Sequence, residues 1–247
     1  MSDWQPLIGP RLKLERAALH IREFEALSET YFADEPYTIC VDQHPDNGPS
    51  LKAVFHRTIP PMASAIVGDF IHNLRSALDH LAADMIRASG KMVTRDTRFP
   101  IHNSKEGFEG GVPKDLMGAE PRFMQFVMEL KPYESTPEKR SFNDIARLNN
   151  DDKHNLLIQG TPALSVSRMV IYTDEGIFPI ESVAIIDGMQ NRLPGNIVQK
   201  IHVEGHPRLM MHLIAGDLAS IAPVVLALNA MFSCVETTVN DAAPLFV

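Results

Sequence analysis

The sequence is poor in cysteine, and the cysteines it has are isolated. Only Cys40 and Cys234 occur in 247 residues, far apart and outside any Cys-x-x-Cys pair. A disulfide framework and a metal–thiolate site therefore lack support. Isolated thiols in apolar surroundings are typical of core residues in a reducing compartment, so we expect both to be buried.

Targeting and cofactor motifs are missing as well. The first residues have neither a basic region nor an apolar run, and the most apolar segment, 221–231, is too short to span a bilayer. We therefore expect a cytoplasmic protein without a membrane association. No Gly-rich phosphate loop, G-x-S-x-G elbow or H-E-x-x-H sequence is present, and no cofactor is predicted.

Excess basic charge is also absent. The formal charge of −8 argues against a broad nucleic-acid or anionic-membrane surface, although it is compatible with a local basic cleft. The hydrophobic fraction of 45% and the charged fraction of 22% are ordinary for a globular protein with a full-sized core. Disorder is therefore not expected outside the ends of the chain.

The first third of the sequence predicts two helices with a β-hairpin between them. Apolar residues at helical spacing predict helices over Arg11–Ser28 and over Pro61–Gly90, the second being the longest and clearest in the chain. Between them, the β-type runs Tyr37–Gln43 and Leu51–Arg57 flank His-Pro-Asp-Asn-Gly-Pro, which predicts a hairpin.

The second half of the chain predicts further helices and a sheet. Residues 91–119 are rich in glycine and proline and are expected to form loops, followed by helices over 121–130 and 141–158. Strand-like runs cover 166–172, 177–186, 197–204 and 208–214, with turn residues between them that favour an antiparallel sheet. A final helix is expected to start near Asp217 and to pack on another helix. The whole predicts one α+β domain over residues 1–247, with a helical core around the long helix, an N-terminal β-hairpin, and a C-terminal antiparallel sheet followed by a packing helix.

The long helix carries an unusual polar face. Spacings of three and four place its polar residues in two neighbouring columns, the first made of Asp69, Asn73, Ser76 and His80 and the second of His72, Arg75 and Asp79. Arg75 and Asp79 could simply form an i,i+4 ion pair on an exposed surface. Exposed helices usually carry Lys and Glu, however, so this composition indicates a partly covered polar pocket.

The segment Arg75-Ser76-Ala77-Leu78-Asp79-His80 resembles the Arg-x4–6-His signature of the HEPN superfamily, helical domains found in many bacterial toxin and defence ribonucleases. The resemblance implies a dimeric, metal-independent ribonuclease with RNA as substrate. It assigns Arg75 to phosphate and transition-state stabilisation and His80 to acid–base catalysis. Guanidinium pairs well with phosphate, and imidazole titrates near neutrality, so the chemistry is consistent with these roles. HEPN domains are helical bundles, whereas this chain predicts a hairpin and a sheet.

A second polar segment, Asn149-Asn150-Asp151-Asp152-Lys153-His154, could complete the site if it packs against the long helix. Lys153 and His154 would then join the catalytic set, with Asp152 among the binding residues. Equally, the asparagines and aspartates could cap a solvated helix start.

Two other functions stay open from the sequence. Asp69-x-x-His72 and Asp151-x-x-His154 repeat a carboxylate–imidazole pair that helical-bundle metal sites use with Glu, so facing helices could bind Zn, Mn or Fe. Alternatively, the chain is a non-catalytic interaction or ligand-binding module, in which the final helix and the polar face serve assembly into a homo-oligomer.

Overall fold

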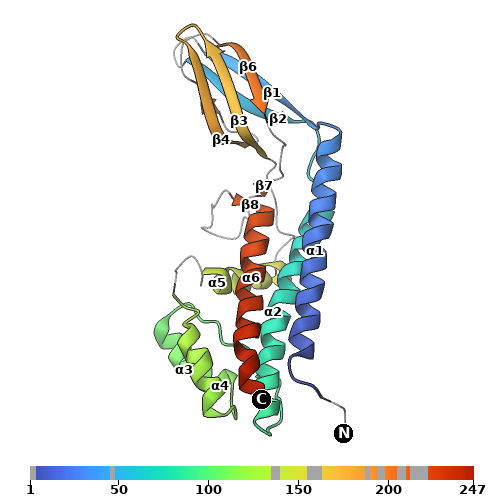
Figure 1. Ribbon diagram of the computed structural model, residues 1–247, viewed down its shortest axis with the longest axis vertical. Helices are drawn as coiled ribbons and strands as arrows, with labels where there is room; N and C mark the ends of the chain where they lie inside the picture. The colour runs from blue at the N-terminus through green and yellow to red at the C-terminus, as the bar shows by residue number, and fades with distance from the viewer. Residues whose placement is uncertain are drawn as a thin grey trace. The chain divides into compact units, whose positions relative to one another are not determined.

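The computed structural model describes residues 4–44, 48–134, 140–154, 163–186, 190–193, 198–204, 210–211 and 222–247, which form an α+β fold as predicted. The chain folds into two compact units (Figure 1). The helical unit comprises residues 1–23, 65–158 and 227–247, and the β unit comprises residues 24–64 and 159–226. The prediction of a single domain stays a prediction, because compactness does not show whether either unit folds alone.

The two longest helices are the expected ones. Helix α1 spans Ile8–Ala33 and α2 spans Met62–Ala88. On α2 the apolar stripe predicted from the sequence is fully buried, and its members are Val67, Phe70, Ile71, Leu74, Leu78, Leu81 and Met85. Gly90 ends the helix as predicted: its φ of +67° is the left-handed geometry of a helix C-terminus, and the following N–H returns to the carbonyl of Ile86 at 3.1 Å.

Helix α3, Lys105–Asp115, lies within the region 91–119 that the sequence predicted to be rich in loops, and the prediction missed this helix. Two local features stabilise it. The Ser104 hydroxyl accepts the backbone N–H of Gly107 at 3.1 Å as an N-cap, and Phe108 and Val112 on one face are fully buried. Tertiary burial of that face therefore outweighs the low helix propensity of its glycines.

Helices α4, Pro121–Leu130, and α5, Arg140–His154, agree with the predicted positions. The last helix, α6, spans Val224–Ala242 and therefore begins after the predicted start near Asp217, which lies outside the described residues. Its buried apolar residues recur at helical spacing and form one packing face, made of Val224, Leu228, Met231, Val235 and Val239. A 3₁₀ turn, Ala243–Phe246, follows it.

The predicted hairpin forms the first sheet of the β unit. Strands β1, Tyr37–His44, and β2, Gly48–Phe55, pair antiparallel from Tyr37 with Phe55 to His44 with Gly48. The short strand β5, Asn191–Arg192, adds to the far side of β2, giving the order β1-β2-β5. Leu51 and Ala53 of β2 are buried and belong to the core of this unit.

The antiparallel C-terminal sheet is confirmed. Strand β3, Ala163–Thr173, lies between β4, Ile177–Ile186, and β6, Val198–Glu204. The fourth predicted strand is described only as β7, Met210–Met211, which pairs with β8, Ala222–Pro223, in a separate two-stranded sheet. Among the described residues, no helix has the length and apolar composition needed to cross a membrane.

Candidate functional site

The polar face of α2 is uneven in its exposure. Asp69, His72 and His80 are exposed, whereas Asn73 is only 8% exposed. Asn73 donates to the Asp69 carbonyl at 2.7 Å and accepts the Lys13 ammonium of α1 at 3.5 Å. The part of the face around Asn73 is therefore covered by α1, while its two histidines reach solvent.

Arg75 and Asp79 form a clamp on a neighbouring segment. The Arg75 guanidinium donates to both oxygens of Asp79, at 3.2 and 2.8 Å, which confirms the i,i+4 pair. It also donates to the Phe99 carbonyl at 3.0 Å, and the Phe99 N–H donates to Asp79 at 3.0 Å. Because the Arg75 side chain is only 15% exposed, it is committed to this contact in the structure.

His80 lies apart from that clamp. Its ring packs on α1 at Gly9, where an added Cβ would lie 2.8 Å from Nδ1. Within the described part of the chain its imidazole makes no hydrogen bond. His80 lines a shallow hollow of about 220 Å³ together with Ser76, Asp79, Ala83 and Arg87, and Arg75 is not among the lining residues.

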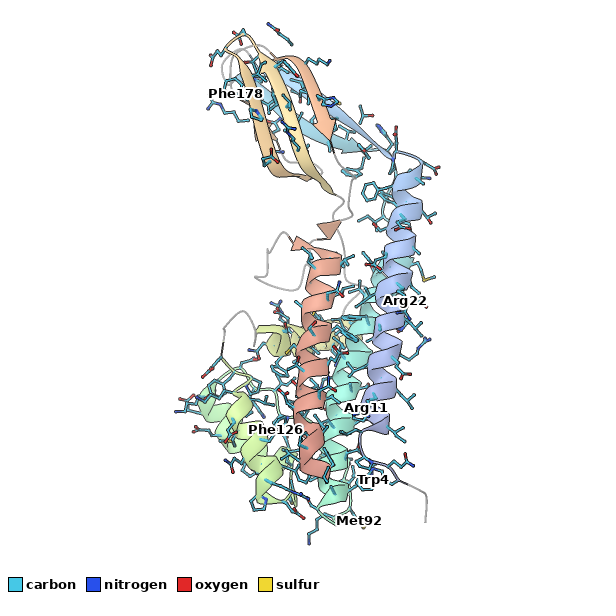
Figure 2. The ribbon with its side chains drawn as sticks, viewed as in Figure 1. Trp4, Arg11, Arg22, Met92, Phe126 and Phe178 are labelled. Carbon is cyan, nitrogen blue, oxygen red and sulfur yellow. The ribbon has the colours of Figure 1, made fainter. Side chains whose placement is uncertain are left out.

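One buried carboxylate fixes the wall of this hollow. Asp84 accepts the Trp4 indole N–H at 3.0 Å and the Leu7 backbone N–H at 2.9 Å, so it ties the residues before α1 to α2 (Figure 2). It also accepts Arg87 at 2.9 Å. Arg87 is 41% exposed, so its guanidinium is held at one end and open to solvent at the other.

The second predicted segment does approach α2. Asp152 of α5 packs against Gly68, where an added Cβ would lie 2.5 Å from the carboxylate oxygen Oδ1. This contact places the 149–154 segment against α2 at Gly68, the residue that precedes Asp69. The structure describes the backbone of Lys153 and His154 but not their side chains, so their predicted roles stay predictions.

The described residues do not provide the group of ligands that the metal-site alternative requires. Asp69 and His72 are exposed, and the Ser76 hydroxyl contacts the His72 ring at 3.5 Å. Over the described ranges of the chain, no group of three or more His, Cys, Asp or Glu side chains could bind a metal ion. The side chain of His154, the further ligand that this hypothesis requires, is not among the described side chains.

A cluster that the sequence did not reveal lies between α3 and the segment 98–102. The Asp115 carboxylate, 3% exposed, accepts Arg98 Nε at 2.8 Å and is 2.9 Å from His102 Nε2. The bond to Asp115 raises the pKa of the Arg98 guanidinium, which therefore stays charged. The helical spacing of Phe108, Val112 and Asp115 could have predicted helix α3, but the neighbouring glycines, which disfavour a helix, outweighed it in the sequence pattern.

The cysteines are less buried than predicted, since both are partly exposed free thiols. Burial raises the pKa of the Cys234 thiol to about 11. The thiolate is the reactive form of cysteine, so Cys234 is a poor nucleophile at neutral pH.

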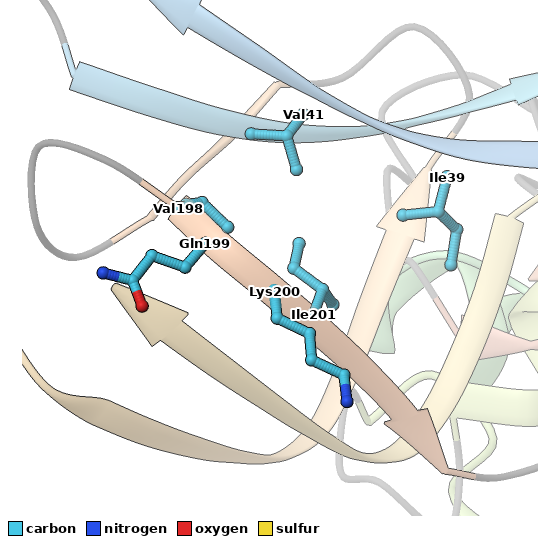
Figure 3. Close-up of a pocket in the computed structure, with 6 residues that line it drawn as sticks. All are labelled: Ile39, Val41, Val198, Gln199, Lys200 and Ile201. Atoms are coloured by element: carbon cyan, nitrogen blue, oxygen red, sulfur yellow. The ribbon is translucent and has the colours of Figure 1, made fainter. Parts of the chain in front are cut away.

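The β unit contains an aliphatic groove between β1 and β6, with a volume of about 290 Å³. Ile39 and Val41 face Val198 and Ile201 across it, while Lys200 points away (Figure 3). Strand β6 has one extra residue at this point, because Lys200 pairs with Tyr172 but Val198 pairs with Thr173. This bulge keeps Val198 and Ile201 on the same inner face.

Comparison of the chain with protein-family models, with curated proteins and with solved structures gave no match.

Proposed function

We propose that the chain is a metal-independent ribonuclease, as its resemblance to HEPN proteins suggests, with His80 as the acid–base residue. The observation that supports this most is the exposed imidazole of His80, which has no hydrogen-bond partner among the described residues and lies beside Arg87 in one hollow. His80 and Arg87 are seven positions apart on α2, so they project from the same side about two turns apart. An imidazole and a guanidinium on one face suit a phosphodiester, which needs proton transfer and charge stabilisation.

The reaction requires no external oxidant or cofactor. His80 takes the proton from a ribose 2′-hydroxyl, and the oxygen attacks the adjacent phosphorus. The bond from phosphorus to the 5′-oxygen breaks, and the leaving oxygen receives a proton from the imidazolium. The products are a 2′,3′-cyclic phosphate and a free 5′-hydroxyl, and His80 returns to its starting form.

The arginine of the motif takes a supporting role in this proposal. Arg75 is held by Asp79 and by the Phe99 carbonyl, and it does not line the hollow. Arg87 does line it and has an exposed guanidinium end. The phosphate contact is therefore assigned to Arg87, while Arg75 keeps α2 joined to the segment at Phe99.

The test is cleavage of a fluorogenic single-stranded RNA in the presence of EDTA. His80→Ala should lower the rate by about 10²–10⁴-fold, the usual contribution of a positioned acid–base group. The matched control is His72→Ala, which removes another exposed histidine of the same helix face and should leave the rate unchanged. Arg87→Ala should lower the rate, whereas Arg75→Ala should lower it only in proportion to lost folded protein, measured by circular dichroism.

Full activity in His80→Ala, or equal losses in His80→Ala and His72→Ala, would reject the ribonuclease. Complete loss in Arg75→Ala protein that is still folded would return the phosphate contact to Arg75, as the motif predicts. Activity that disappears with EDTA would point instead to metal-dependent chemistry.

The second candidate, a homo-oligomeric assembly module, is favoured by the outer face of α1. Ile8, Leu12 and Leu19 are 46%, 56% and 38% exposed, on the side opposite the buried Leu14 and Ala17. Large apolar residues repeating along an exposed stripe are typical of helix–helix contacts.

A second copy of this chain would match that stripe by its charges as well as by its apolar residues. If two α1 helices pair antiparallel about the point between Glu15 and Arg16, Leu12 of each copy meets Leu19 of the other. Glu15 of each copy then faces Arg16 of the other, so the charges beside the apolar contacts are complementary.

Light scattering coupled to size exclusion separates this candidate from a monomer. The double variant Leu12→Asp/Leu19→Asp should change a dimer into a monomer. The control Ile177→Asp alters an apolar residue of the β unit that is 64% exposed and should not change the mass. A monomeric wild type, or a dimer that survives the double variant, would remove the assembly candidate.

A further inference from the structure

We propose that His102 is the acid–base residue of a second site, in which Asp115 orients the imidazole and Arg98 binds an oxyanion group of the substrate. The site is separate from the hollow at His80 and does not depend on the ribonuclease proposal. The expected substrate carries a phosphate or carboxylate next to a hydroxyl group or an attacking water.

The Asp115 carboxylate orients the imidazole of His102. One carboxylate oxygen of Asp115 is 2.8 Å from Arg98 Nε, and the other is 2.9 Å from His102 Nε2. A carboxylate at Nε2 keeps the proton there, so the lone pair of a neutral ring lies on Nδ1. Carboxylate–histidine pairs of this kind orient the imidazole of many general bases and stabilise its protonated form.

The ring of His102 is rigidly held yet reachable. It packs directly on α3 at Gly111, where an added Cβ would lie 2.3 Å from Nε2, and it contacts the edge of Phe108. Its side chain is 27% exposed, whereas that of Asp115 is 3% exposed. The buried atoms therefore fix the ring, and the exposed fraction remains for a substrate.

The main chain that carries both basic groups is anchored from two sides. The Arg98 N–H donates to the Asp115 carbonyl at 3.2 Å, which ties the segment to α3. Phe99, the next residue, is fully buried and is bonded through its N–H to Asp79 of α2. A base held this way loses little conformational entropy when a substrate binds.

Arg98 provides the cation. Its side chain is 62% exposed, and among the described residues its side-chain hydrogen bond runs from Nε to Asp115, which leaves the donors of the terminal nitrogens for a ligand. Within the same described residues, Asp79 and Asp96 are the further charged groups that act on it. A guanidinium fixed at one nitrogen presents the remaining donors in the planar fork that matches phosphate and carboxylate oxygens.

The proposed step moves a single proton. A substrate hydroxyl or water gives its proton to Nδ1 of His102, and its oxygen keeps the electron pair for attack on the group that carries the anion. The imidazolium formed is stabilised by the Asp115 carboxylate, and it later returns the proton to the leaving group. No oxidant, metal or cofactor takes part in this step.

The experiment measures how fast each histidine of the whole, native chain is acylated by diethyl pyrocarbonate, followed by peptide mass spectrometry. His102 should react several-fold faster than His72, although His72 is the more exposed of the two. Asp115→Asn should remove that advantage. A purely structural contact between His102 and Asp115 would instead make His102 the slower histidine, because burial shields it.

The anion is tested with inorganic phosphate and with acetate as competitors. Phosphate should protect His102 from acylation in the wild type and in Arg95→Gln, a control arginine that is 95% exposed, but not in Arg98→Gln. Protection by phosphate alone assigns a phosphate substrate, and equal protection by acetate assigns a carboxylate. Protection by neither anion, or unchanged protection in Arg98→Gln, overturns the role of Arg98.

If Asp115→Asn fails to fold, the wild type still decides the role of His102. Long-range ¹H–¹⁵N NMR should show the proton of neutral His102 on Nε2 and none on Nδ1. A proton on Nδ1, or acylation no faster than that of His72, overturns the proposal.

Discussion

The helical unit contains two histidine regions that differ in how their rings are held. His80 is exposed on α2, touches Gly9 and has no hydrogen-bond partner among the described residues. His102 lies on an extended segment and is fixed by a buried carboxylate and by the backbone of α3. A short sequence motif identified the first, whereas the second is built from residues that only the fold brings together.

The two regions share one anchor, the segment that begins at Arg98. Asp79 lines the hollow of His80 and accepts the N–H of Phe99, while Asp115 accepts the side chain of Arg98. A change in this segment should therefore reach both histidines, and a change at one ring should stay local.

Phe99→Ala should have the largest effect. The ring is fully buried and stacks on Phe142 with centroids 6.1 Å apart, so truncation should destabilise the chain by about 3–5 kcal/mol. Phe126→Ala, a half-buried ring of α4, is the control and should cost less (Figure 2). Urea unfolding measures both. Equal losses in the two variants would mean that the segment at Phe99 is not a shared anchor.

Asp79→Asn should come next. The amide keeps an acceptor for Phe99 but removes the charge that pairs with Arg75, at a cost of about 1–2 kcal/mol for this partly exposed pair. Asp69→Asn, on the same face but exposed, should change the unfolding free energy by less than about 0.5 kcal/mol. If both variants unfold at the wild-type urea concentration, the clamp contributes nothing to stability.

A matched pair of glycine substitutions gives the most direct test of the contrast between the two rings. Gly111→Ala forces the His102 ring from Asp115 and should cost about 1–3 kcal/mol, because a buried carboxylate loses a partner. In Gly9→Ala the exposed ring of His80 can turn away, so the stability should stay within about 1 kcal/mol of the wild type. The reverse order, measured by the same unfolding experiment, would contradict the contrast between a held and a free ring.

Local patterns predicted the regular elements well. The apolar stripe of α2, its end at Gly90 and the β1–β2 hairpin follow from spacing and turn chemistry, and the structure confirms them. The ion pair of Arg75 with Asp79 was also foreseeable, because i,i+4 neighbours on a helix are fixed by local geometry.

The features that the sequence could not predict depend on contacts between residues that are distant along the chain. The third hydrogen bond of Arg75 goes to the backbone carbonyl of Phe99, and no periodic pattern in the sequence marks that contact. Helix α3 was missed because Gly107, Gly110 and Gly111 argue against a helix, although Gly111 is where the His102 ring packs. Gly111 lowers the helix propensity of this segment, yet the close packing of the His102 ring leaves no room for a larger residue there.

The clamp on the segment at Phe99 also bears on the order in which the chain folds. Its side-chain bonds join residues 20 and 24 positions apart, and those of Asp115 join residues 17 and 13 positions apart. Closing loops of this length costs less entropy than closing longer ones, and short-range contacts form early. The region from Arg75 to Asp115 contains every group in these bonds, so it can assemble on the ribosome before α5, the β3–β4–β6 sheet or α6 has been synthesised.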